Sequence, residues 1–226
     1  MKPTYNIILR ILDIFISALA ILMLLPVFLV VIFILRFSGE RNIFYLQERV
    51  GFNMKPFFVF KFATMLKNSP NIATGAITLR NDPRVLPFGK ILRKTKINEL
   101  PQLFNILKGD MSFVGPRPLM DKQFRFYDSE SQKIISQMKP GLTGVASIIF
   151  RDEERYFNGS DNPDIIYRTK IAPAKALLER WFFENMSLRL YFKIFFITVM
   201  AVLSPHKNFN SFLDDETRVE LENVLR

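Results

Sequence analysis

The longest apolar segment of the chain predicts a membrane helix near the N-terminus. Residues 14–35 (IFISALAILMLLPVFLVVIFIL) carry no charge. They extend over about 22 positions, or ~33 Å as a straight helix, which is close to the hydrocarbon thickness of a bilayer. No small-residue cleavage site follows a short apolar region, so a removable signal peptide is not expected. The segment therefore predicts a helix that stays in the membrane.

Two features bear on how this helix enters the bilayer. Pro26 removes a backbone hydrogen bond in the middle of the run and divides it into arms of about 18 and 14 Å, each near one leaflet deep. Both ends are basic, and the flanking cations are Lys2, Arg10, Arg36, Arg41, Arg49 and Lys55. The positive-inside rule then places both ends on the cytoplasmic side. A helix that bends at Leu25-Pro26 and returns satisfies both features, and a kinked spanning helix is the open alternative.

A second apolar zone, residues 181–203 (WFFENMSLRLYFKIFFITVMAVL), is amphiphilic. Arg189 and Lys193 interrupt it, and the uncharged part at residues 194–203 is too short to span a bilayer. Aromatic side chains beside cations are typical of a helix that lies in the headgroup layer. Packing as a helix of the protein core explains the same pattern equally well.

The region between these zones predicts short strands and helices. Residues 43–65 contain two aromatic and β-branched runs separated by Gly51, Asn53 and Pro56, which indicates a β-hairpin. Turn-forming residues also separate the remaining segments. These segments are a polar loop over residues 67–82 and helices over residues 87–93, 121–138 and 208–226.

The segment KTKINELPQLFN predicts the start of another helix. Asn98 is expected to cap a helix that runs from Glu99 to about Leu107. Pro101 falls in the first turn, where a missing amide proton costs little, and Gly109 provides the stop. An amide followed by an acid at this place suits either a catalytic pair or an ordinary cap.

Composition narrows the classes of function. The formal net charge is +10, with 31 Lys and Arg residues beside 24 Phe, so we expect an anionic partner: nucleic acid, acidic lipid or a phosphorylated substrate. The chain has no Cys, which excludes disulfides and thiolate metal sites. The single histidine, His206, is expected in a solvated loop and argues against a Ser–His catalytic pair. A nucleic-acid binder is disfavoured because these cations share the chain with segments of lipid depth.

Cations gather in the predicted loops, although the usual nucleotide-binding glycine motifs are missing. Arg117 lies in GPRP, where two prolines stiffen the backbone around one guanidinium, and a fixed guanidinium suits bidentate phosphate binding. Taken alone, a surface turn with a solvated arginine explains GPRP better. The other loop cations are Lys61, Arg80, Arg84, Arg93, Lys94 and Lys96.

Four motifs, taken in order, change that interpretation. They are FYLQERVG, FKFATM, NDPRVLPFGKILRKTKINELPQLFNILKGDMSFVGPRP and KPGLTG. Together they closely resemble the bacterial sugar transferase family, the monotopic phosphoglycosyl transferases, and the likeness extends to about Leu203. The resemblance implies transfer of a sugar 1-phosphate from a UDP-sugar to polyprenyl (undecaprenyl) phosphate, with Mg²⁺ required and UMP released. Such enzymes act early in exopolysaccharide, capsule and lipopolysaccharide O-antigen synthesis.

The resemblance also implies an architecture. The expected fold is α+β and mostly helical, with a small β-hairpin and a re-entrant membrane helix broken at a proline, which matches Leu25-Pro26. Residues 1–38 would form this membrane segment, residues 39–205 a catalytic domain with interfacial amphipathic helices, and residues 206–226 a charged tail. The active site would face the cytoplasm at the bacterial inner membrane, in contact with membrane lipids. Neither the sugar nor the oligomeric state follows from the sequence.

One catalytic position departs from the family. Its members usually carry an Asp-Glu pair at this helix start, whose Asp attacks the β-phosphorus and whose Glu helps to hold Mg²⁺. Here Glu99 is kept, but Asn98 stands at the Asp position, and an amide has no comparable nucleophilic oxygen. Arg117 is carried over as a ligand of a substrate phosphate, with Lys61 and Arg84 as supporting charges.

Three interpretations of Asn98 stay open. Glu99 takes over as nucleophile or as a base for direct transfer, or the chain belongs to a branch that uses Asn with a rearranged site. In the third, the protein is an inactive relative that binds polyprenyl phosphate or nucleotide sugar as a membrane scaffold. Ala63 in FKFATM and the acidic cluster at residues 152–154 indicate a different pocket for the UDP-sugar. Retention of Arg84, Glu99, Asp110 and Arg117 favours an active branch over a decaying relative. The cluster itself is expected to be solvated, with a replacement ligand or base as the alternative.

Overall fold

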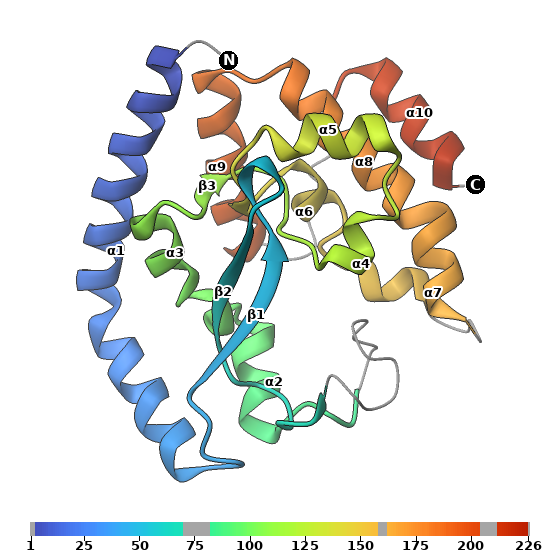
Figure 1. Cartoon of the computed structure of the whole chain (residues 1–226). Coiled ribbons are helices and arrows are strands. Elements are labelled where there is room, and N and C mark those ends of the chain that lie inside the picture. Colours follow the sequence, from blue (N-terminus) through green and yellow to red (C-terminus); the bar gives the residue numbers. More distant parts are fainter. Residues whose placement is uncertain (1–2, 70–81, 158–161, 204–211, 226) are drawn as a thin grey trace. The chain divides into compact units, whose positions relative to one another are not determined.

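The computed structural model describes residues 3–69, 82–157, 162–203 and 212–225 and is mostly helical, with two small sheets (Figure 1). The helices are α1 (Pro3–Phe37), α2 (Pro87–Lys94), α3 (Gln102–Lys108), α4 (Asp121–Phe124), α5 (Ser129–Ser136), α6 (Val145–Ile149), α7 (Pro163–Ile166), α8 (Ala172–Glu184), α9 (Leu188–Leu203) and α10 (Asp215–Leu225). The strands are β1 (Phe44–Val50), β2 (Pro56–Phe62), β3 (Ser112–Val114) and β4 (Gly141–Thr143). Short turns are the 3₁₀ segments η1 (Phe52–Met54), η3 (Ile97–Glu99) and η4 (Glu153–Phe157) and the π-helical η5 (Tyr167–Ile171). The predicted α+β, mostly helical class is confirmed.

Several predicted elements occur close to their expected positions. β1 and β2 pair in a two-stranded sheet with η1 between them, which confirms the hairpin. α2 and α10 confirm two of the predicted helices. The predicted helix over residues 121–138 is instead divided into α4 and α5, because the Asp128 carboxylate accepts the Ser131 N–H at 2.9 Å and starts a new helix. His206 and most of the predicted 67–82 loop lie outside the described residues.

The chain forms two compact units. The first comprises Met1–Glu48 and Phe58–Gly109, and the second comprises Arg49–Phe57 and Asp110–Arg226. The predicted division into a membrane segment, a catalytic domain and a tail is a different one, and it stays a prediction.

α1 is the membrane candidate of the first unit. Among the described residues it is the one helix long and apolar enough to cross a membrane, and its apolar part covers Ile7–Phe37. The helix is curved along its length (Figure 1) and continues through Pro26 without ending there. A long apolar helix is therefore confirmed, and the break at Pro26 and the re-entrant path stay predictions.

One face of α1 is buried within the first unit. Phe28 is in ring contact with Phe62 of β2 and Phe104 of α3, at centroid distances of 5.5 and 5.8 Å. Much of the rest of α1 is exposed and apolar, including Leu22 and Met23. The helix thus contributes to a protein core on one face and keeps an apolar surface on others. The buried cluster consists of Phe28, Val31, Leu35, Phe62 and Leu92.

Arg10 fastens α1 to the C-terminal end of α3. Its Nη1 donates to the carbonyl of Ile106 at 2.6 Å and its Nη2 to that of Leu107 at 2.7 Å. These bonds satisfy carbonyls that a helix end leaves without intrahelical partners. Gly109 follows with φ 103°, and a Cβ there would lie 3.1 Å from Nη2 of Arg10. The backbone at φ 103° favours glycine at this position, and a Cβ would also crowd the Arg10 guanidinium.

Arg10→Gln is expected to lower the free energy of unfolding by about 2 kcal/mol, because two charge-assisted hydrogen bonds are lost. Denaturation of the nanodisc-held protein, followed by circular dichroism, would measure the change. Arg36→Gln is the matched control, since Arg36 is an exposed cation in the last turn of the same helix. Equal losses in the two variants would contradict a specific role for Arg10.

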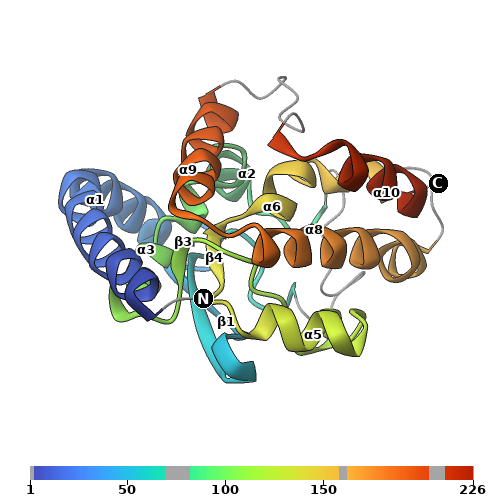
Figure 2. The same cartoon turned by 90° about the horizontal axis from the view of Figure 1, so that it is seen from above.

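The second unit is organised around α8, which contacts α5, α6 and α10. Figure 2 shows α5 and α10 on opposite sides of α8. β3 and β4 pair in parallel, with Ser112 opposite Gly141 and Val114 opposite Thr143. These three-residue strands are too short to give a sequence pattern, and neither was predicted.

α9 has two different faces. Its inner face packs on the parallel pair, where the Tyr191 and Ser112 hydroxyls lie 3.2 Å apart and those of Thr198 and Thr143 lie 2.7 Å apart. Its outer face exposes apolar side chains, among them Phe196. The core interpretation of residues 181–203 is confirmed for the inner face, and contact of the outer face with headgroups stays a prediction.

Candidate active site

The predicted catalytic pair lies in the turn η3 of the first unit. Lys96 precedes it in the left-handed conformation, with φ 60°, and the Glu99 N–H donates to the Lys96 carbonyl at 3.0 Å. α3 begins only after Pro101, and no side chain caps it. The prediction that Asn98 caps this helix is therefore wrong. The chain turns at Lys96 and becomes helical again after Pro101, so Asn98 lies inside a separate 3₁₀ turn.

Asn98 carries a buried oxygen that lacks a partner. The residue is 8% exposed, and its Oδ1 makes no hydrogen bond among the described residues. Ile97 and Leu100 pack against the buried cluster of α1 and hold the turn in place. Glu99 is half-buried beside it. Because a buried acceptor without a donor is costly, this geometry suits an oxygen that binds a cation or a ligand group.

The two supporting cations of the first unit lie in different environments. Lys61 is half-buried on β2. Arg84 is 2% exposed, and its guanidinium donates to both carboxylate oxygens of Asp82, at 2.9 and 2.6 Å, and to the Ser69 carbonyl at 3.0 Å. Arg84 thus holds the chain that leads into α2, while Lys61 keeps part of its surface accessible.

Asn105 ties α3 to β2 and was not predicted. It is fully buried; its Oδ1 accepts the Phe60 N–H at 2.9 Å and its Nδ2 donates to the Phe58 carbonyl at 2.7 Å. An amide on the buried stripe of QLFNILK is the sequence signal for this contact. It fixes the helix that follows the catalytic turn against the strand that carries Lys61.

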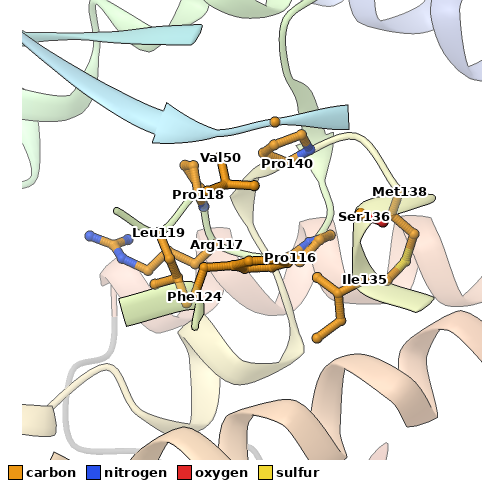
Figure 3. Close-up of a pocket in the computed structure, with 11 residues that line it drawn as sticks. Val50, Pro116, Arg117, Pro118, Leu119, Phe124, Ile135, Ser136, Met138 and Pro140 are labelled. Atoms are coloured by element: carbon orange, nitrogen blue, oxygen red, sulfur yellow. The ribbon is translucent and has the colours of Figure 1, made fainter. Parts of the chain in front are cut away.

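Arg117 lies in the second unit, where two motifs interlock. The Gly115 N–H donates to the Thr143 carbonyl and the Gly141 N–H to the Pro116 carbonyl, both at 2.9 Å. GPRP and KPGLTG therefore form one rigid piece of backbone, on which the Arg117 side chain is exposed. Figure 3 shows Arg117 at a pocket with largely apolar walls, among them Phe124, and its guanidinium extends away from Pro116. An exposed guanidinium on a rigid loop suits a phosphate ligand, and that role of Arg117 stays a prediction.

Gly115→Ala is expected to lower the free energy of unfolding by about 3 kcal/mol, since a rigid, close-packed site cannot make room. A Cβ at this position would lie 2.3 Å from the Lys139 carbonyl oxygen. Denaturant unfolding measures the loss. Ser136→Ala, which removes one exposed bond to the Lys133 carbonyl, is the control. Stability equal to that of the control would contradict the interlocked backbone.

A buried carboxyl lies directly behind this loop. Glu179 of α8 is 1% exposed and accepts the Arg117 N–H. Its Oε2 has no hydrogen-bond partner among the described residues. Burial raises the pKa of Glu179 to about 8, against the opposing effects of the Arg117 N–H and Lys175. The carboxyl is therefore mostly neutral at pH 7.

Lys175 lies one helical turn before Glu179 and pairs with Glu153. Its Nζ donates to Glu153 Oε2 at 2.5 Å and lies 5.2 Å from the ring centre of Tyr167. Burial lowers the pKa of Lys175, and Glu153 opposes that shift. The expectation that the acidic cluster at residues 152–154 is solvated is thus wrong for Glu153, because the buried ammonium requires a counter-charge. The sequence signal was a Lys and a Glu four residues apart on a helix stripe that is otherwise apolar.

Comparison with known proteins identifies the class. The bacterial sugar transferase family matches residues 4–205, so the chain belongs to this family and is a transferase. The exopolysaccharide production protein ExoY of Sinorhizobium fredii is 34% identical over 215 residues, covering 89% of this chain and 88% of the relative.

Longer relatives match over part of their length. A UDP-N-acetylgalactosamine-undecaprenyl-phosphate N-acetylgalactosaminephosphotransferase of Aeromonas hydrophila is 32% identical over 208 residues, covering 90% of this chain and 45% of the relative. An undecaprenyl-phosphate galactose phosphotransferase of Salmonella typhimurium is 33% identical over 174 residues, covering 70% of this chain and 33% of the relative. The resemblance seen in the motifs is confirmed.

Proposed function

We propose that the protein transfers a sugar 1-phosphate from a UDP-sugar to undecaprenyl phosphate and releases UMP, as the first step of a bacterial surface glycan. Family membership supports the reaction, and two of the relatives act by name on undecaprenyl phosphate. α1 provides an apolar anchor at the depth of the lipid acceptor. We place the site at the cytoplasmic face of the inner membrane, with α1 re-entrant at Leu25-Pro26.

The observation that carries this proposal is the turn η3, which keeps Glu99 next to the Asn98 Oδ1, a buried oxygen with no hydrogen bond in the described part of the chain. Both groups offer oxygen ligands of the kind that Mg²⁺ prefers. Among the described residues no group of three or more His, Cys, Asp or Glu side chains could hold a metal ion. Mg²⁺ is commonly held by one or two carboxylates together with substrate phosphates, so Glu99 and Asn98 fit such a site. When bound, Mg²⁺ would offset the charge of the diphosphate.

Asn98 favours direct transfer. Its amide cannot form the covalent phosphosugar of the family's usual mechanism, whereas polyprenyl phosphate is itself an anionic nucleophile. In this route an oxygen of polyprenyl phosphate bonds to the β-phosphorus of the UDP-sugar. The bond from that phosphorus to the bridging oxygen breaks, and UMP leaves. Arg117 binds a substrate phosphate, Lys61 adds positive charge, and Arg84 shapes the segment before α2.

UMP release tests the proposal. The assay contains nanodisc-held protein, undecaprenyl phosphate, Mg²⁺ and a panel of UDP-sugars, with omission of the lipid as control. Lipid-dependent UMP from one UDP-sugar is expected and would identify the sugar. If folded protein releases no UMP with any UDP-sugar, the alternative is favoured: a membrane scaffold that binds polyprenyl phosphate or nucleotide sugar without chemistry. The neutral Asn98 at the nucleophile position is the observation that favours this alternative.

Asn98→Asp tests the route. The variant restores the family's usual nucleophile, so it is expected to form a covalent phosphosugar adduct with the active UDP-sugar when lipid is omitted, while the wild type forms none. Intact-protein mass spectrometry detects the adduct. Asn53→Asp, at an exposed amide in η1, is the control. An adduct on wild-type Glu99 would contradict direct transfer and make Glu99 the nucleophile.

A further inference from the structure

We infer that Glu179 is a positioning residue for the UDP-sugar: it holds the backbone of Arg117 from inside the protein, and Arg117 binds the diphosphate well only while Glu179 is uncharged. This inference rests on the proposed function, in which Arg117 binds a phosphate of the UDP-sugar.

The contacts around Glu179 join it to both interlocked motifs. Its carboxyl group accepts the Arg117 N–H, and a Cβ at Gly144 would lie 3.9 Å from its Oε1. Pro116 and Pro118 flank Arg117 and leave its backbone little freedom to adjust. The backbone that carries the exposed Arg117 side chain is therefore held by a carboxyl that is almost fully buried.

The surrounding charges make the ionisation of Glu179 consequential. Lys175 is already paired with Glu153, so an ionised Glu179 would add a second negative charge to this buried group. Burial raises the pKa of both Tyr127 and Tyr167, so their hydroxyls stay neutral. Apart from Glu179 itself, the groups that act electrostatically on Glu179, Lys175, Tyr127 or Tyr167 are Arg49, Arg117, Glu153, Tyr167 and Lys175.

Neutral and ionised Glu179 differ in their effect on Arg117. Either form can accept the Arg117 N–H, but the anion also places a negative charge behind the loop that an incoming diphosphate approaches. Since the pKa of Glu179 is about 8, the anion becomes the main form between pH 7 and pH 9. We expect the affinity for UDP to fall by about tenfold over that interval, which corresponds to about 1.4 kcal/mol.

Binding of UDP to the nanodisc-held full chain, with Mg²⁺, tests this by calorimetry from pH 6.5 to pH 9. The wild-type Kd is expected to rise about tenfold. Glu179→Gln keeps a neutral acceptor oxygen, so its Kd should stay within about twofold. Glu184→Gln, at the exposed last residue of α8, should follow the wild type. Titration of UDP itself is common to all three proteins and cancels in the comparison.

Three outcomes would overturn the inference. The first is a Glu179→Gln curve parallel to that of the wild type. The second is the absence of UDP binding by the wild type at every pH. UMP release is measured separately, so failure of this inference can be distinguished from failure of the proposed function. The third concerns Glu179→Asp, whose shorter side chain cannot reach the Arg117 N–H without a shift of the loop. That variant should raise the KM for the UDP-sugar several-fold with little change in kcat, and an unchanged KM would remove the positioning role.

Discussion

Glu99→Gln is expected to reduce lipid-dependent UMP release by at least about a thousandfold with the fold intact, since one preorganised electrostatic contact can supply that much. Glu99 is the single carboxylate in the turn η3. The amide keeps the shape of the side chain but removes the charge that would hold Mg²⁺. The turn itself is held by backbone hydrogen bonds and by Ile97 and Leu100 against α1, so the fold is expected to survive the loss of the charge.

Single-turnover UMP release and circular dichroism would be measured on the same nanodisc preparation. Glu184→Gln removes an exposed carboxylate elsewhere and should retain wild-type activity. Glu99→Asp keeps the charge on a shorter side chain, so it should recover part of its activity at high Mg²⁺, whereas Glu99→Gln should not. Near-normal turnover of Glu99→Gln would show that the catalytic site has been assigned to the wrong residues.

The parts of the fold that sequence reasoning predicted are those defined by neighbouring residues. An uncharged apolar run predicted α1, and aromatic runs separated by Gly51 and Pro56 predicted the hairpin. Gly109 was predicted as the stop of α3, and it adopts the left-handed conformation found there. In each case the pattern and the structure it causes lie within one segment of the chain.

The parts that were missed depend on contacts between distant segments. Gly115 meets Lys139, and Arg117 meets Glu179, more than twenty positions away in each case. A local pattern does not show that a glycine has backbone against it or that a charge lies in a core. The wrong cap at Asn98 has the same origin, because the left-handed Lys96 depends on how η3 packs against α1.

The motifs of the candidate site were easier to predict than their chemistry. GPRP and KPGLTG were recognised as parts of one family pattern, and the structure shows that they interlock. The carboxyl that supports them, Glu179, belongs to a helix whose composition is that of an ordinary core helix. A residue that supports a site from behind is marked by its burial, and burial is not visible in a single sequence.

The second large effect is expected in the pH dependence of stability, and Glu179 is its cause. The pKa of this carboxyl is about 4.5 when unshifted and about 8 in the folded protein. Between these values the folded protein holds a proton that the unfolded chain releases. The contribution of Glu179 to the free energy of unfolding is therefore fully present below pH 4.5 and is lost as pH rises to 8. A raised pKa of this size corresponds to about 4–5 kcal/mol as an upper figure.

Lys175 acts in the opposite direction at higher pH. Its pKa is lowered by burial, so the folded protein releases this proton before the unfolded chain does, and stability recovers on the alkaline side. The interval from pH 5 to pH 8 covers the fall expected from Glu179, and comparison with Glu179→Gln separates it from the effect of Lys175. Denaturant unfolding of wild type and Glu179→Gln over this interval should give a falling curve and a flatter one. Between pH 5 and pH 8 the free energy of unfolding of the wild type should fall by about 3 kcal/mol or more beyond any fall in the variant.

Parallel curves would mean that Glu179 is ionised in the folded protein at pH 5. Lys175 and the Arg117 N–H would then have to stabilise the anion more than burial destabilises it. Ionisation at pH 5 would also remove the basis for a UDP affinity that changes near pH 8. The stability measurement therefore tests, without substrate, the same charge on which the expected change in UDP affinity depends.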